Sequence, residues 1–168
     1  MSELEIIIEV DEQDRPIGNR PRSEFAGAAH IHRTSHLLLL NPEGQLLLPK
    51  RPSIGKLYSG RSSFSAAGWV REGETYEQTL ERQAQKELGI QLESHECLFT
   101  FRFTDEREDA FKTVYRSVHE GPFQFNPEDS ESQQWVELGV LRSDLSRSPK
   151  QYSPPFVVAM KQYFDQNA

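Results

Sequence analysis

Residues 68–90 are the stretch of this chain whose residue types and spacing best suit chemistry. Gly68 is followed six residues later by Glu74 and eight residues after that by Arg82, and the run closes with Glu87-Leu88-Gly89-Ile90. Carboxylate oxygens are typical ligands of Mg²⁺, and guanidinium groups pair well with phosphate. The segment is therefore the first place to look for a site that handles a phosphorylated ligand.

The same segment has the signals of one amphipathic helix. Thr75 followed three residues later by Gln78 is a capping-box pattern, so a helix should begin there. Gly89 provides a left-handed stop. An apolar stripe for the core is formed by Tyr76, Leu80, Ala84 and Leu88. Gln83 and Glu87 are four residues apart, so we expect both along one exposed flank of the helix. In any ordinary helix of this kind, Glu87 would be a solvated charge.

Taken together, the segment resembles the Nudix box, whose pattern is Gly-x5-Glu-x7-Arg-Glu-U-x-Glu-Glu-x-Gly-U, with U aliphatic. The resemblance implies an α/β/α sandwich around a mixed β-sheet. It also implies Mg²⁺-assisted cleavage of a diphosphate joined to another group. The matching positions are Gly68, Glu74, Arg82, Glu87, Gly89 and Ile90, with Ala84 at the inner aliphatic position. Gln83 and Lys86 stand where the family carries carboxylates.

These two departures affect the metal site that the resemblance implies. Of the residues that would hold the metal, Glu87 and Gly68 remain in this chain. The amide of Gln83 cannot act as a base near neutral pH. The ammonium of Lys86 places a positive charge where the ion would sit. Three alternatives stay open: Mg²⁺ or Mn²⁺ binds weakly, the phosphates of the substrate draw the ion in, or the ammonium replaces part of its charge.

Basic residues before the box are candidates for binding substrate phosphates. The resemblance assigns this role to a residue at the end of the strand that precedes the loop, which selects Arg51 with Lys50 beside it. Farther along the Pro/Gly/Ser-rich loop, Lys56 and Arg61 are expected to be solvated. Arg51 is therefore the basic residue that we expect to matter most.

Acidic loops beyond the box are candidates for the missing base. Some Nudix hydrolases take their base from such a loop, and a carboxylate there could complete a site that has one carboxylate on the helix. The two acidic clusters cover residues 105–109 and 128–131. Such clusters are more often solvated. Within them we select Glu128 or Glu131 as the catalytic carboxylate.

The wider sequence is similar to the Nudix branch that contains the type I isopentenyl-diphosphate isomerases and related hydrolases. The similarity rests on residues 41–51, 121–135 and 152–154. The isomerases use a cysteine just before the box glycine and a histidine just after it, where this chain has Ala67 and Trp69. Allylic isomerisation would therefore lack its acid, and isomerase remains an alternative.

Three histidines are relevant to the isomerase alternative. His30, His32 and His36 share strand parity and could in principle face one metal ion. A histidine trio at the beginning of a strand is more often part of a surface or of a pocket lining. Their role is not settled by the sequence.

Composition limits the remaining possibilities. A chain of 168 residues suits one domain over residues 1–168. The net charge of −7, with scattered Lys and Arg, argues against a large nucleic-acid surface. Cys97 is the one cysteine and fits a reducing compartment. We find no signal-peptide or membrane-spanning pattern, so we expect a cytoplasmic protein with no membrane partner.

Strand signals outnumber helix signals, which predicts a mixed α/β (α+β) fold. The clearest pair of strands is a hairpin that turns at Asn41-Pro-Glu-Gly44. The predicted strands are 4–10, 32–40, 45–49, 63–68, 90–102, 110–119 and 134–138. The predicted helices are 75–88 and 154–166, with short turns of helix at 23–29 and 141–145.

Three functions fit these observations. The first is a Nudix-type hydrolase of a nucleoside diphosphate derivative, weak because the box is degenerate. The second is a non-catalytic Nudix module that binds such a ligand or a protein partner. The third is an enzyme similar to isopentenyl-diphosphate isomerase. In each case we expect a small-molecule diphosphate as the ligand.

Overall fold

A mixed β-sheet forms the centre of the protein in the computed structural model, which describes residues 4–55 and 57–167. The sheet has six strands in the order β6-β7-β3-β4-β8, with β5 paired to β3. β3 and β7 are parallel, and the other pairings of the sheet are antiparallel. The strands are β3 (His32–Leu40), β4 (Leu46–Lys50), β5 (Ala66–Trp69), β6 (Glu96–Thr104), β7 (Asp109–Val118) and β8 (Ser132–Val136).

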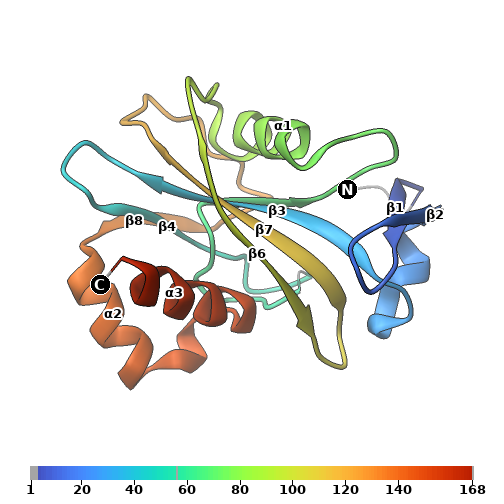
Figure 1. The fold of residues 1–168 in the computed structure, drawn as a ribbon. Coiled ribbons are helices and arrows are strands. Elements are labelled where there is room, and N and C mark those ends of the chain that lie inside the picture. Colours follow the sequence, from blue (N-terminus) through green and yellow to red (C-terminus); the bar gives the residue numbers. More distant parts are fainter. Residues whose placement is uncertain (1–3, 56, 168) are drawn as a thin grey trace.

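Helices cover both faces of this sheet (Figure 1). α1 (Tyr76–Leu88) lies on one face, and α2 (Leu138–Arg147) and α3 (Pro154–Gln166) lie on the other. The α/β/α sandwich and mixed sheet expected from the sequence are therefore confirmed. None of the helices in the described part of the chain is both long enough and apolar enough to cross a bilayer. The assignment of residues 1–168 to one domain stays a prediction.

A small N-terminal module stands beside the main sheet (Figure 1). It consists of the antiparallel hairpin β1 (Ile6–Val10) and β2 (Pro16–Pro21), followed by the 3₁₀ segment η1 (Arg22–Ala28). The short helix expected at 23–29 is a kinked 3₁₀ segment, because Gly27 takes a positive φ of 67°.

Apolar side chains along β3 point alternately to the two faces of the sheet and contribute to a hydrophobic core on each face. Leu37 and Leu39 face α1, where they meet Leu80 and Leu88 of the predicted stripe. Leu38 belongs to the opposite cluster with residues of α3. Successive side chains of a strand point to opposite faces, so one apolar run fills both cores.

The sheet opens beside β3, and this opening makes room for a cavity. β3 pairs with β4 at Leu40 and Leu46, and with β5 between residues 34–37 and 66–69. The hydroxyl of Ser65 bridges the gap, since it accepts from Leu39 N at 2.9 Å and donates to Leu47 O at 2.8 Å. β4 and β5 thus leave β3 in different directions, and the loop between them borders the opening.

Most element boundaries shift by a few residues from those predicted. β6 begins at Glu96 rather than at Ile90, which is buried under α1. α2 is longer than the predicted turn at 141–145, and η2 (Pro149–Gln151) precedes α3. The capping box at Thr75 and Gln78 and the left-handed stop at Gly89 are both present.

Candidate functional site

Glu74 and Arg82 tie the loop before α1 to the helix. Arg82 donates from Nε to Glu74 Oε2 at 2.8 Å and from Nη2 to Glu74 Oε1 at 2.9 Å. The same Nη2 donates to the carbonyl of Trp69 at 3.0 Å, and the backbone N–H of Arg71 donates to Glu74 at 3.0 Å. A bidentate pair of this kind fixes geometry as well as charge. These two box residues therefore position the loop that carries Trp69.

Gln83 lies inside the protein, 4 % exposed. Its amide nitrogen donates to Ala67 O at 2.7 Å and to Glu87 Oε2 at 2.8 Å, and its oxygen accepts from Arg82 Nη1 at 2.6 Å. The expectation of an exposed flank is therefore wrong for Gln83, because the side chain turns back across β5. Its carbonyl oxygen is also already engaged by Arg82.

Gly68 is the point at which Gln83 crosses β5. A Cβ atom at position 68 would lie 2.3 Å from Gln83 Cγ and 2.4 Å from Gln83 Cδ. Only glycine at position 68 leaves room for the Gln83 side chain to cross β5. The glycine of the box is thus required by the close approach of the amide that holds Glu87.

Gly68→Ala should lower the free energy of unfolding by about 2 kcal/mol or more, since the methyl group overpacks the crossing and displaces buried hydrogen bonds. Urea unfolding followed by circular dichroism measures this change. Gly139→Ala is the matched control, because a Cβ there meets nothing within 4 Å and the position lies in α2. That change should be neutral or slightly stabilising. An unaltered midpoint in Gly68→Ala would contradict the close approach.

Glu87 is a partly buried carboxylate at the end of α1. Its Oε2 accepts from Ala67 N at 3.0 Å as well as from Gln83. Burial raises the pKa of Glu87 to about 7, and the neighbouring Asp129 carboxylate adds to this rise. The two donors and the Lys86 ammonium oppose it. A carboxyl group with such a pKa changes its charge near neutral pH, which is typical of functional sites.

Asp129 provides the second carboxylate beside Glu87. Its Oδ1 lies 3.3 Å from Lys86 Nζ, and the Asp129 side chain is 11 % exposed. Its Oδ2 is buried and has no hydrogen-bond partner among the described residues. A buried carboxylate oxygen without a partner is costly unless a ligand or water satisfies it. Lys86 therefore pairs with an acidic neighbour rather than leaving the site positively charged.

A turn after β7 carries Asp129 to α1. Asn126 N donates to Glu87 O at 3.2 Å, and Asn126 O accepts from Asp129 N at 3.0 Å. The Asn126 side chain also accepts from Glu128 N at 3.0 Å. These bonds form an Asx-type turn that directs Asp129 inward. The Asn126-Pro127 pair is the sequence signal for this turn, and sequence reasoning selected its neighbours instead.

The structure places Glu128, Glu131 and Lys50 outside the cavity described below. Glu128 is exposed. Glu131 accepts from Ser53 Oγ at 2.7 Å and lies 3.5 Å from Lys50 Nζ, and both charged groups are well exposed. Asp129, which the sequence choice of Glu128 or Glu131 passed over, lines the cavity instead. Lys50 is the exposed last residue of β4.

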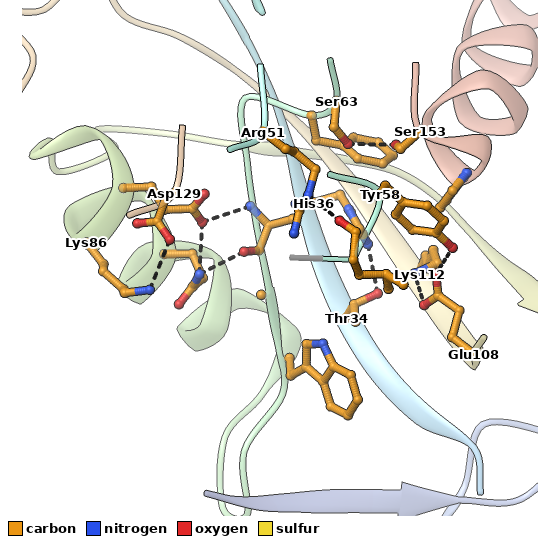
Figure 2. Close-up of a pocket in the computed structure, with 18 of the residues that line it drawn as sticks. Thr34, His36, Arg51, Tyr58, Ser63, Lys86, Glu108, Lys112, Asp129 and Ser153 are labelled. Atoms are coloured by element: carbon orange, nitrogen blue, oxygen red, sulfur yellow. Dashed lines mark hydrogen bonds and ion pairs between the residues drawn. The ribbon is translucent and has the colours of Figure 1, made fainter. Parts of the chain in front are cut away.

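One cavity of about 410 Å³ brings the candidate residues together. Glu87, Gln83, Gly68 and Asp129 line it, and so does Arg51, the basic residue favoured from the sequence. Figure 2 shows Arg51 between the side of Lys86 and Asp129 and the side of Glu108 and Lys112. Further cationic groups in the lining are Arg22, Arg82, Lys86 and Lys112. Arg61 is not in this lining, and Lys56 lies outside the described residues.

Arg51 is held facing these carboxylates. Its Nε donates to Leu57 O at 2.6 Å, which fixes the guanidinium against the loop. Burial lowers the pKa of Arg51, while attraction from Glu87, Asp129 and Glu108 opposes the fall. An arginine keeps its charge under such shifts. Arg51 can therefore present a permanent positive charge to an anionic ligand.

A buried triad of Tyr58, Glu108 and Lys112 forms the other side of the cavity (Figure 2). Lys112 Nζ lies 2.7 Å from Glu108 Oε1, and the Tyr58 hydroxyl donates to Glu108 Oε2. Sequence reasoning noticed the acidic stretch 105–109 but not Lys112. The available signal was a lysine between Ala110 and Val114, the adjacent positions on the same face of β7.

The three histidines do not converge on one point. His30 Nδ1 lies 2.9 Å from Glu9 Oε2, whereas His36 Nε2 lies 2.7 Å from Thr34 Oγ1. His32 stacks on Trp69 with 3.6 Å between ring centroids. Burial lowers the pKa of His32 and of His36, so both rings are neutral near pH 7. Within the described ranges, no three His, Cys, Asp or Glu side chains gather as a metal site.

Comparison with known proteins identifies the family of this chain. The family model for the NUDIX domain matches residues 30–155. The chain belongs to the NUDIX family. A prenyl-diphosphate phosphatase of Methanosarcina mazei is 36 % identical over 154 residues, covering 89 % of each chain. An isopentenyl-diphosphate isomerase of Klebsiella pneumoniae is 30 % identical over 166 residues, covering 92 % of this chain and 88 % of that one.

A solved structure has the same fold. A Deinococcus radiodurans protein superposes with a TM-score of 0.81 and 24 % identity, covering 94 % of this chain and 98 % of that one. The NUDIX assignment, the similarity to the isomerase branch and the expectation of a NUDIX enzyme are confirmed. The roles of the individual site residues stay predictions.

Proposed function

We propose that this protein is a metal-dependent hydrolase that releases phosphate from an organic diphosphate. The observation that carries the proposal is the pairing of Glu87 with Asp129 in the wall of a cavity that also contains Arg51. Both hydrogen bonds to Glu87 fall on Oε2, and Lys86 contacts Asp129 at Oδ1. One oxygen of each carboxylate is thus not used in these contacts.

The carboxylate pair suits Mg²⁺ or Mn²⁺. Mg²⁺ is usually held by one or two carboxylates together with substrate phosphates and waters, rather than by a cage of protein ligands. The buried Oδ2 of Asp129 without a protein partner is the observation that favours such a ligand. When bound, the ion would offset the negative charge of the diphosphate. Binding to the protein alone should be weak, because Lys86 competes for Asp129.

The protein's own groups divide the remaining tasks. Gln83 and the Ala67 N–H hold Glu87 in place. Arg51 binds an oxygen of the substrate phosphate and stabilises the charge that develops as water attacks phosphorus. The water oxygen forms the new bond to the terminal phosphorus, and the water gives its proton to the carboxylate pair. The bond between this phosphorus and the bridging oxygen then breaks, and the bridging oxygen leaves with the organic monophosphate.

The cavity favours a substrate whose organic group is not a nucleotide. Its aromatic rings are already in contact with other groups: Trp69 with His32 at 3.6 Å, Phe64 with His36 at 4.2 Å, and Tyr58 with Arg107 at 4.7 Å. Little ring surface is therefore left for stacking a base. A prenyl diphosphate is the substrate class that we favour, because the M. mazei relative is named for this substrate and because Leu57, Phe64 and Pro155 give the mostly polar lining some apolar surface. A nucleoside diphosphate derivative is the second substrate class.

The isomerase alternative lacks its cysteine and histidine at positions 67 and 69 of this cavity. Ala67 and Trp69 occupy the two positions where the isomerases have cysteine and histidine, and Cys97 is exposed on β6. Trp69 is also packed against His32 rather than turned toward a ligand. These residues give no thiol that could protonate a double bond.

A phosphate-release assay tests the proposal. We expect the protein to release phosphate from isopentenyl or dimethylallyl diphosphate with Mg²⁺ or Mn²⁺, faster than it cleaves ADP-ribose, and not after chelation with EDTA. Chromatography of the products separates hydrolysis from isomerisation. Cleavage of ADP-ribose alone would favour the nucleoside class, and ligand binding without turnover in any assay would favour a non-catalytic module.

A further inference from the structure

A tyrosine on the loop between β4 and β5 contacts the beginning of β7. The Tyr58 hydroxyl donates to Glu108 Oε2, and the Arg107 guanidinium lies over the face of the Tyr58 ring, 4.7 Å from its centroid. Figure 2 shows the Tyr58 side chain directed toward Glu108 and Lys112. The loop is therefore attached to the central sheet through this side chain.

Lys112 gives the attachment a buried anchor. Its Nζ lies 2.7 Å from Glu108 Oε1, and the side chains of Lys112 and Glu108 are 3 % and 5 % exposed. A buried ion pair is costly unless further hydrogen bonds satisfy its remaining groups. The Tyr58 hydroxyl supplies such a bond, because it donates to the second oxygen of Glu108. The ion pair and the position of the loop therefore stabilise each other.

The backbone of the loop is also constrained. Its ends are joined, since Arg51 N donates to Arg61 O at 2.9 Å. Tyr58 has a φ of 59°, which is in the left-handed region that residues other than glycine seldom adopt. Such a conformation persists where the surrounding contacts determine it. The contact between the Tyr58 side chain and Glu108 is one that can do so.

The same loop fixes the guanidinium of Arg51. The carbonyl of Leu57, the residue before Tyr58, accepts from Arg51 Nε at 2.6 Å. The position of this carbonyl depends on Tyr58, because one peptide bond joins the two residues. With Nε bound to Leu57, Arg51 would bind a phosphate through its two Nη groups. Tyr58 is thus one residue away from the contact that orients Arg51.

We infer that Tyr58 is a positioning residue for Arg51: anchored by Glu108 and Lys112, it holds the Leu57 carbonyl where that carbonyl directs the guanidinium toward the substrate phosphate. The inference rests on the proposed function for the role of Arg51. Tyr58 acts through the loop and does not need to touch the substrate. Its contribution to phosphate binding should therefore depend on the presence of Arg51.

A double-mutant cycle with imidodiphosphate, a diphosphate that resists hydrolysis, tests this dependence without turnover. With Mg²⁺ present and the full chain in the calorimeter, Arg51→Gln should weaken binding by roughly 10- to 100-fold and Tyr58→Phe by roughly 5- to 10-fold. In the Arg51→Gln background, Tyr58→Phe should weaken binding by less than about twofold, because no guanidinium remains to be positioned. Losses that add in the double variant would overturn the inference. Native affinity in Tyr58→Phe, or no binding of imidodiphosphate to the native protein, would overturn it too.

Tyr115→Phe is the matched control. The Tyr115 hydroxyl also donates to a carboxylate, at 2.9 Å from Glu77 Oε1, but Tyr115 belongs to the core cluster beneath α1. This variant should bind imidodiphosphate within about twofold of the native protein. Thermal unfolding of each variant confirms that the proteins are folded. An equal loss of binding in Tyr115→Phe would assign the effect of Tyr58→Phe to general destabilisation and remove the positioning role.

Turnover separates this inference from the proposed function. With isopentenyl diphosphate, Tyr58→Phe should lower kcat as well as raise KM, whereas Tyr115→Phe should change neither by more than about twofold. A native protein that shows the coupling between Tyr58 and Arg51 yet hydrolyses no prenyl diphosphate would keep the inference and remove the proposed function. A hydrolase in which the two losses add would keep the proposed function and remove the inference.

Discussion

Glu87→Gln should abolish hydrolysis, lowering kcat/KM by roughly 10³-fold or more, because a metal ligand in such a site is worth several kcal/mol of transition-state stabilisation. The amide has nearly the same shape, so the hydrogen bond from Ala67 N can be kept and the fold should remain. Phosphate release from a prenyl diphosphate measures the loss, and titration with Mn²⁺ measures metal binding. Glu81→Gln is the control, since Glu81 is an exposed carboxylate on the same helix. Unchanged turnover in Glu87→Gln would remove this residue from the mechanism.

The same variant should alter the pH dependence of stability when divalent cations are absent. The pKa of Glu87 is about 7 in the folded protein, against an ordinary value of 4.5, so folding takes up a proton between these values. Stability from this group is therefore highest at low pH and is lost as the pH rises from about 4.5 to about 7, by on the order of 2 kcal/mol. Glu87→Gln should lose less stability than the native protein between these pH values. Parallel curves for the two proteins in EDTA would contradict the raised pKa.

The sequence was sufficient to predict the helix and the strands that carry the site. Local patterns specified the helix, because a capping box at Thr75 and a glycine stop at Gly89 act within a few residues. The alternation in β3 and the hairpin turn at 41–44 were similarly local. Arg51 was selected through the resemblance, which places a phosphate-binding basic residue at the end of this strand. Boundaries such as the beginning of β6 shifted because tertiary packing, here the burial of Ile90, overrides local propensity.

The direction of side chains could not be predicted in the same way. Gln83 occupies a helical position that would normally be solvated, and it is buried because β5 has a glycine opposite it. Lys86 was expected to place a positive charge at the metal position, but the turn at Asn126 brings Asp129 to it. Replacing Gln83 and Lys86 with glutamate would therefore not place both family carboxylates on the exposed surface of the helix. The new carboxylate at position 83 would be buried beside Glu87. Arg22 was missed because it belongs to the N-terminal module, which is distant from the box in the sequence but contributes to the cavity wall.

Asp129→Asn should lower hydrolysis by roughly 10²- to 10³-fold, because the site would lose one of its two carboxylates while Lys86 would keep its charge. The variant should also bind Mn²⁺ more weakly, since an ammonium group without its partner repels a cation. Glu128→Gln is a closely matched control, as it changes the adjacent residue, removes the same charge and lies outside the cavity. It should retain at least half of the native activity.

The double variant Lys86→Met with Asp129→Asn distinguishes two effects of losing the Asp129 carboxylate. One is the loss of a metal ligand, and the other is the loss of the negative partner of the Lys86 ammonium. If the main effect of Asp129→Asn is repulsion by Lys86, the double variant should recover metal binding but little activity, because the second carboxylate is still missing. If Asp129 acts on the substrate directly, both variants should be equally inactive with similar metal affinity. Native activity in Asp129→Asn together with a loss in Glu128→Gln or Glu131→Gln would instead assign the second carboxylate to the outer face of the turn, which the buried Oδ2 of Asp129 argues against.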